Sequence, residues 1–105
     1  MPVVLTVLYP QPTDARAFDA AYTAHEALLR ANANIPEGQT PYTITRFAAG
    51  PEGPAPYYQM FQLPFPSADA LQQGMASPAM QEVAADAVRI STGGPPVILV
   101  GAPAA

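Results

Sequence analysis

The sequence predicts an α+β domain whose strands and helices follow one another as β-α-β-β-α-β. The first observation is a set of short segments that are β-branched or alternate in polarity, as strands do. The second is a pair of longer segments with apolar residues at helical spacing. The third is a connection of glycines and prolines that is too short for a helix and predicts a hairpin. With 105 residues, the chain is expected to form one domain, 1–105, around one modest core.

The first segment, Pro2–Tyr9, is apolar on both faces, which is typical of a strand that is covered on each side. Pro10 and Pro12 end this strand. Thr13 or Asp14 can then accept the free backbone N–H groups of a first helical turn. We therefore expect a central strand followed directly by a helix.

The segment Asp14–Arg30 has the clearest helical pattern in the chain. Phe18, Tyr22, His25 and Leu29 follow one another at steps of four, three and four, so they share one stripe of a helix. The only histidine of the sequence therefore points in the same direction as large apolar side chains.

The two middle strands are predicted at Tyr42–Ala49 and Pro56–Leu63, joined by the turn-rich segment Gly50–Pro54. Tyr42–Ala49 is expected at an edge of the sheet, and it carries Arg46. Both faces of these strands are apolar enough that alternation alone does not decide which face meets the helices.

A second helical region begins after Ser67, which is a good N-cap, and a fresh cap at Ser77 with Pro78 behind it predicts a restart or bend. The helix should continue to about Ile90. Its apolar stripe is predicted to comprise Leu71, Met75, Met80, Val83, Ala84, Ala87 and Val88.

Val97–Val100 is the last predicted strand, and it closes a core of residues 1–100, with 101–105 as a tail. This order of elements is the ferredoxin-like arrangement. Right-handed crossovers place both helices on one face of a four-stranded antiparallel sheet. Because the other face is apolar and uncovered, we expect a homodimer packed sheet to sheet, with a ligand cavity between sheet and helices.

The composition excludes several classes of function. Eight acidic residues against four arginines and no lysine give a net charge of −4, so no basic surface is available for nucleic acid or an anionic membrane. No cysteine and a single histidine argue against a metal cluster, and we expect neither metal nor cofactor. The apolar N-terminus is too short for a signal or membrane segment, so a cytoplasmic protein is expected.

The sequence also resembles the EthD-like family, which is named for ethyl tert-butyl ether degradation and belongs to the dimeric α+β barrel superfamily. The resemblance extends from about Val3 to Val100. It implies a homodimeric barrel with a small-molecule cleft in each protomer, among relatives that include cofactor-free oxygenases, cyclases of polyketide biosynthesis and muconolactone-type isomerases. The residues that carry it are Tyr9-Pro10, AFDAAYTAH (Ala17–His25), PYYQMFQLPFPSADAL (Pro56–Leu71) and MASPAMQEVAADAV (Met75–Val88).

The resemblance places the family's helix-one histidine pattern on Tyr22 and His25, and its late acidic residue on Asp86. Family members often read His-Ala-Pro-Leu here, whereas this chain has Glu26 and Ala27 after the histidine. Without the proline, the helix should run straight for another turn.

His25 and Asp86 are the candidate catalytic residues. His25 is either a hydrogen-bonded core histidine or, because an imidazole titrates near neutral pH, the acid/base of a proton transfer. Asp86 either faces Arg89 in solvent or turns inward to orient His25.

Five further side chains are candidates for substrate binding. Tyr22 either shares the cleft with His25 or only packs in the core, and Arg46 either binds an anionic group of the substrate or protects a sheet edge from aggregation. The full set is Tyr22, Arg46, Tyr9, Tyr58 and Phe61.

Together these residues predict a homodimeric protein that binds a small, largely apolar organic molecule. The expected chemistry is cofactor-independent proton transfer, as in isomerisation, cyclisation or simple oxygenation, with His25 as acid/base. The alternative is a non-catalytic accessory or ligand-binding protein of a catabolic pathway.

Overall fold

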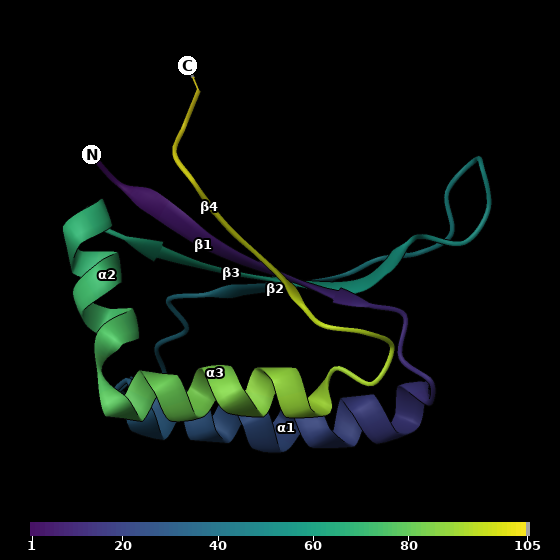
Figure 1. Cartoon of the computed structure of the whole chain (residues 1–105), viewed down its shortest axis with the longest axis horizontal. Helices are drawn as coiled ribbons and strands as arrows, with labels where there is room; N and C mark the ends of the chain where they lie inside the picture. The colour runs from purple at the N-terminus through teal and green to yellow at the C-terminus, as the bar shows by residue number, and fades with distance from the viewer. Residues whose placement is uncertain (105) are drawn as a thin grey trace.

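The computed structural model describes residues 1–104 as one sheet with a layer of helices on one of its faces (Figure 1). The order of elements matches the predicted one, except that the second helical region is divided in two. The elements are β1 (Val3–Pro10), α1 (Ala15–Asn32), β2 (Thr43–Arg46), β3 (Tyr57–Phe65), α2 (Ala68–Ala76), α3 (Pro78–Ile90) and β4 (Val97–Gly101).

The four strands form one antiparallel sheet in the order β2-β3-β1-β4. β1 and β3 are central and β2 and β4 are the edges, so the ferredoxin-like fold is confirmed. α1 and α3 lie side by side across one face, whereas α2 lies at the end of the sheet (Figure 1). Among residues 1–104, nothing covers the other face.

The strands differ from the predicted boundaries mainly at the hairpin. β2 ends at Arg46 rather than at Ala49, because the chain leaves the ladder after Phe47 donates to the carbonyl of Tyr58 at 3.0 Å. Residues 47–56 then form an arm that projects from the body (Figure 1). At the other end of the chain, β4 includes Gly101, so the predicted tail is shorter by one residue, and its last residue, 105, lies outside the described part.

α1 begins as predicted, with the Asp14 carboxylate accepting from the backbone N–H of Ala17 at 3.2 Å. It continues to Asn32, as the absence of a proline after the histidine predicts. All four residues of its predicted stripe are buried, namely Phe18, Tyr22, His25 and Leu29.

Ser77 divides the second helical region, since its hydroxyl caps α3 by accepting from the backbone N–H of Met80 at 3.2 Å. The predicted stripe is wrong at one position: Val88 is 57% exposed, and Ile90 is buried instead. Val88 is rotated by about 100° from its buried neighbour Ala87, whereas Ile90 lies three residues beyond Ala87 on the same face.

β1 shows which face of the sheet meets the helices. Val3, Leu5, Val7 and Tyr9 are buried, and the residues between them are half-buried on the outer face. The strand is apolar on both faces because it is a central strand with a core on one side and an uncovered apolar surface on the other. No helix of residues 1–104 is long and apolar enough to span a membrane.

Candidate functional site

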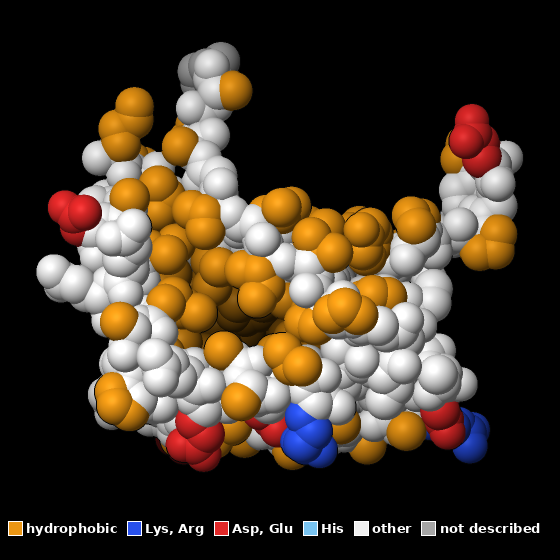
Figure 2. Space-filling model, in the orientation of Figure 1, with side chains coloured by type: hydrophobic (Ala, Val, Ile, Leu, Met, Phe, Trp, Pro, Cys, Tyr) orange, Lys and Arg blue, Asp and Glu red, His pale blue; other side chains and the backbone are white. Residues whose placement is uncertain are grey.

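A pocket lies between the helix face of the sheet and the layer formed by α1 and α3. Its mouth is an apolar hollow between β4 and α3, with α2 at one end (Figure 2). The cavity volume is about 50 Å³, and the whole hollow, including the solvent at its mouth, is about 500 Å³. The lining residues are Leu5, Val7, Tyr9, His25, Leu29, Phe61, Leu63, Met75, Met80, Val83, Ala84, Ala87 and Ile98.

His25 and Asp86 meet in the wall of this pocket. The stripe of α1 turns His25 toward α3, where Asp86 lies next to the buried Ala87. The distance from His25 Nδ1 to Asp86 Oδ2 is 2.8 Å, and the His25 side chain is only 6% exposed. Asp86 also accepts from Arg89 through its other oxygen, with Nε at 2.9 Å and Nη2 at 2.6 Å. The two predicted positions of Asp86, facing Arg89 or turned inward to His25, therefore both occur, because one carboxylate oxygen contacts each residue.

The contact with Asp86 determines which nitrogen of the imidazole carries a proton. Burial raises the pKa of Asp86, but the hydrogen bonds from His25 and Arg89, and then the positive charge of Arg89, lower it, and the lowering prevails. An ionised carboxylate only accepts hydrogen bonds, so Nδ1 of His25 carries the proton. In the neutral imidazole, Nε2 then has a free lone pair.

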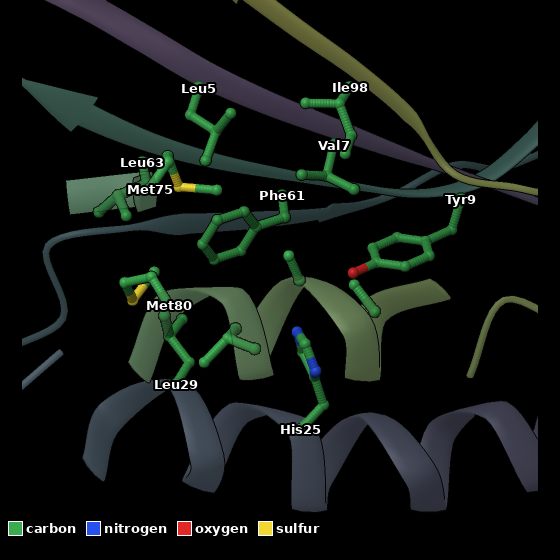
Figure 3. Close-up of a pocket in the computed structure, with 13 residues that line it drawn as sticks. Leu5, Val7, Tyr9, His25, Leu29, Phe61, Leu63, Met75, Met80 and Ile98 are labelled. Atoms are coloured by element: carbon green, nitrogen blue, oxygen red, sulfur yellow. The ribbon is translucent and has the colours of Figure 1, made fainter. Parts of the chain in front are cut away.

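Nε2 of His25 has no hydrogen-bond partner among residues 1–104, and the ring points from α1 toward the sheet, into the pocket (Figure 3). An imidazole with a carboxylate behind Nδ1 and a free Nε2 in front can accept a proton at Nε2.

Tyr9 is the second polar side chain of the pocket. It is 1% exposed, and its hydroxyl points into the pocket on the side of His25 (Figure 3). Burial raises the pKa of Tyr9, and the negative charge of Asp86 raises it further. Tyr9 therefore stays protonated at neutral pH and can donate a hydrogen bond to a bound oxygen.

Tyr22 lies behind the pocket rather than in its wall. Its ring centroid is 5.3 Å from that of His25 and 5.6 Å from that of Tyr9. Its hydroxyl and the Gln59 amide nitrogen are both buried, and neither has a hydrogen-bond partner within 3.5 Å among residues 1–104. Burial, and then the neighbouring Tyr9, raise the pKa of Tyr22. Tyr22 thus packs against the rings of His25 and Tyr9 but does not line the pocket.

Arg46 and Tyr58 lie outside the pocket, on the other side of α1. Arg46 Nη2 is 2.9 Å from Asp19 and 2.9 Å from the Gln59 side-chain oxygen, and Nη1 donates to the Tyr58 hydroxyl at 2.7 Å. The side chains of Arg46 and Asp19 are each 46% exposed. This surface cluster (Asp19, Arg46, Tyr58) joins β2 and β3 to α1, and the structure does not bring it to His25.

A β-bulge explains why Tyr58 reaches α1. Tyr9 pairs with Gln59 and Pro10 pairs with Tyr57, so Tyr58 is the extra residue between them. Its ring packs edge-on against Phe18, with centroids 5.5 Å apart. Neighbouring residues of one strand therefore both point toward the helix layer, which alternation does not predict.

Of the predicted site residues, His25, Tyr9 and Phe61 line the pocket, and Asp86 lies directly behind His25. The sequence did not identify as lining residues the apolar side chains that shape the pocket, above all Met75, Met80 and Ile98. The helical periodicity identified the two methionines as inward-facing, but it did not identify them as lining residues. No group of metal-ligating side chains occurs in residues 1–104.

The family model for the EthD domain matches residues 10–93, which is most of the chain and includes His25 and Asp86. The chain belongs to the EthD family. A curated relative from Rhodococcus erythropolis is an uncharacterized 11.0 kDa protein in the thcB-thcC intergenic region. It is 33% identical over 95 residues, which cover 86% of this chain and 84% of the relative.

Two solved structures share the fold over nearly their whole length. An ethyl tert-butyl ether degradation (EthD) family protein from Bacillus halodurans is 28% identical and has a TM-score of 0.81, covering 98% of this chain and 99% of the other. A dimeric ferredoxin-like protein of unknown function from Jannaschia is 18% identical and has a TM-score of 0.72, covering 95% and 97%. The second likeness shows the fold alone.

Proposed function

We propose that this EthD-family protein binds a small, largely apolar organic molecule and catalyses cofactor-independent proton transfer on it, with His25 as general base. The observation that carries the proposal is the contact of 2.8 Å between His25 Nδ1 and Asp86, because it leaves Nε2 free toward the pocket. Isomerisation, cyclisation and simple oxygenation can each begin with the removal of a proton by such a base.

The charges around the pocket favour a neutral substrate that contains a carbonyl or phenol oxygen. No arginine lines the pocket, and the nearest charge behind His25 is the Asp86 carboxylate. An anionic group would therefore be buried without a partner, which is costly. A neutral carbonyl would instead accept a hydrogen bond from Tyr9 while Nε2 of His25 removes a proton from the neighbouring carbon. Donation to the developing oxyanion stabilises the transition state.

The proposal includes a cytoplasmic homodimer. The outer face of the sheet presents half-buried apolar side chains, including Val4, Leu8 and Met60, and Leu99 at the edge is 50% exposed. An apolar surface of this kind is typical of an interface between subunits. The dimeric neighbour with the same fold supports the same arrangement. Light scattering should give twice the mass of the 11.0 kDa chain, and a monomer at micromolar concentration would contradict the dimer.

Solvent deuterium exchange tests the chemistry without knowledge of the natural substrate. 2-Tetralone, a neutral ketone with acidic C–H bonds, is incubated with the protein in D₂O, and deuterium uptake is followed by NMR. The wild type should accelerate exchange over buffer, and His25→Gln should lose about a hundredfold or more of that acceleration. Asp86→Asn should also slow exchange, because it removes the negative charge beside Nδ1 of His25. Asp69→Asn, on the exposed surface of α2, is its control and should keep the wild-type rate, because it makes the same chemical change away from the pocket. Equal rates for wild type and His25→Gln in a folded protein would refute the catalytic role.

A non-catalytic binding or accessory role is the second candidate, and the burial of His25 favours it. The residue is only 5% exposed, and the cavity beside it is small, as for a histidine that is part of the core. The deuterium-exchange experiment distinguishes the two functions, because a protein that only binds 2-tetralone would not accelerate its uptake of deuterium.

A further inference from the structure

The pocket has a polar end and an apolar end. His25 and Tyr9 lie at one end, and Leu63, Met75 and Met80 lie at the other, toward α2 (Figure 3). A ligand that places an oxygen beside Tyr9 would therefore direct the rest of its body toward the methionines.

A second hollow begins behind the apolar end. It lies where α1 ends and α2 meets α3, and its cavity volume is about 280 Å³. Two side chains, Leu63 and Met80, line both this hollow and the pocket, so they form the wall between the two spaces. The other lining residues of the hollow are Asn32, Ala33, Asn34, Phe65, Gly74 and Ser77.

The sizes of the two spaces indicate that they act together. An apolar cavity of about 150 Å³ binds a single benzene ring, whereas the pocket beside His25 has about 50 Å³. The larger space lies on the far side of Met80. Methionine is unbranched and has three rotatable bonds, so it changes rotamer more easily than the other core residues. A rotamer change of Met80 would join the hollow to the pocket.

We propose that the site takes an elongated neutral ligand, with a carbonyl-bearing head beside His25 and Tyr9 and a linear apolar tail that passes Met80 into the second hollow. The inference rests on the proposed function for the nature of the head, and on the shared wall for the tail. His25 and Asn32 are separated by seven residues of α1, or about 10 Å along the helix axis, so the tail must be at least of that length.

The experiment measures the binding of alkyl phenyl ketones of increasing chain length, from acetophenone to decanophenone, by isothermal titration calorimetry. Each methylene that leaves water should tighten binding about fourfold, which corresponds to about 0.8 kcal/mol. In the wild type the increase should continue to the longer ketones. In Met80→Phe it should stop at the length that reaches the aromatic ring. Val88→Phe is the control, because Val88 is exposed on the same helix and lines neither space, and this variant should keep the wild-type dependence on chain length.

Gly74→Leu is a second variant in case Met80→Phe does not fold. Gly74 borders only the hollow, and a Cβ there would be 3.4 Å from the Phe65 ring, so a side chain can be added from the far side of the wall. This variant should weaken the long ketones relative to the short ones. The inference is overturned if affinity stops rising at the same chain length in the wild type, Met80→Phe and Gly74→Leu.

His25→Gln separates this inference from the proposed function. It removes the base but leaves the wall of Leu63 and Met80 intact. A retained dependence on chain length in His25→Gln supports the tail site even where deuterium exchange shows no catalysis, whereas a loss of that dependence in every variant contradicts the tail site alone.

Discussion

Two hydrogen-bonded pairs that each contain an aspartate lie on opposite sides of α1, and they have very different surroundings. Asp86 and His25 meet at 2.8 Å, with side chains 16% and 6% exposed, whereas Asp19 and Arg46 meet at 2.9 Å with both side chains 46% exposed. The distances are nearly equal, so distance does not distinguish the pairs. Water screens the surface pair and leaves it little net energy, whereas loss of a partner in the buried pair exposes the other group to an environment that cannot solvate it. Of the two pairs, only the buried one faces the pocket.

The largest expected effect is the loss of the buried partner. Asp86→Ala removes the acceptor of His25 Nδ1 and should lower the free energy of unfolding by about 2 to 3 kcal/mol, as for a buried hydrogen bond to a charged group. Asp19→Ala should lower it by less than about 1 kcal/mol. Urea denaturation of both variants at neutral pH measures the two costs. If both variants lose the same free energy of unfolding, burial does not make the His25–Asp86 pair more important for stability than the Asp19–Arg46 pair.

Next in size is the effect of Tyr9→Phe on proton transfer. The variant keeps the buried ring but removes the hydroxyl that points into the pocket, so the rate of deuterium exchange of 2-tetralone should fall about tenfold to a hundredfold. Stability should change little, because the apolar packing of Tyr9 against Phe18, at a centroid distance of 5.3 Å, is retained. An unchanged exchange rate would remove Tyr9 from the chemistry and leave it a packing role.

The contribution of Asp86 to stability should depend on pH. The pKa of Asp86 is lowered in the folded protein, so its contribution is fully present above the pKa of the unfolded chain, near about 3.9, and is lost as the pH falls through the folded value. The difference in stability between the wild type and Asp86→Ala should therefore be large at pH values above about 5 and should shrink toward pH 2. Urea denaturation across this range measures it. A difference that does not depend on pH would mean that the side chain acts only by packing.

The smallest effect is expected for Arg46→Gln. This variant leaves the pocket intact, and it should reduce stability by less than about 1 kcal/mol, with the reduction smaller still at high salt. Chemical denaturation at low and high ionic strength tests this expectation. A change in the affinity for an alkyl phenyl ketone would instead show that Arg46 reaches the ligand, as the sequence allowed.

The fold could be predicted because its signals are local. Helical spacing placed Phe18, Tyr22, His25 and Leu29 in the core, and the caps at Ser67 and Ser77 placed the starts of α2 and α3. The single wrong position in the stripe, Val88, lies at the edge of the buried face, where small rotations of a helix decide exposure.

The site could be predicted only in part. Periodicity identified His25 as an inward polar side chain. It left open whether Asp86 faces Arg89 or His25, and whether Arg46 binds a substrate or protects the edge of the sheet. Which residues meet across elements depends on how helices pack and on how strands register, and neither has a local signal. The bulge at Tyr58 is an example, because it moves one side chain to the helix layer and so builds the surface cluster rather than the pocket.

The sequence by itself determined the order of the elements, the inward histidine and the absence of a basic surface, since these follow from spacing and composition. The tertiary structure decided that Asp86 stands behind His25, that Tyr9 faces it, and that Met80 lies between two hollows. The physical reason is that α3 packs beside α1 over one particular face of β1, and this packing brings together residues that are 16 and 61 positions apart in the chain.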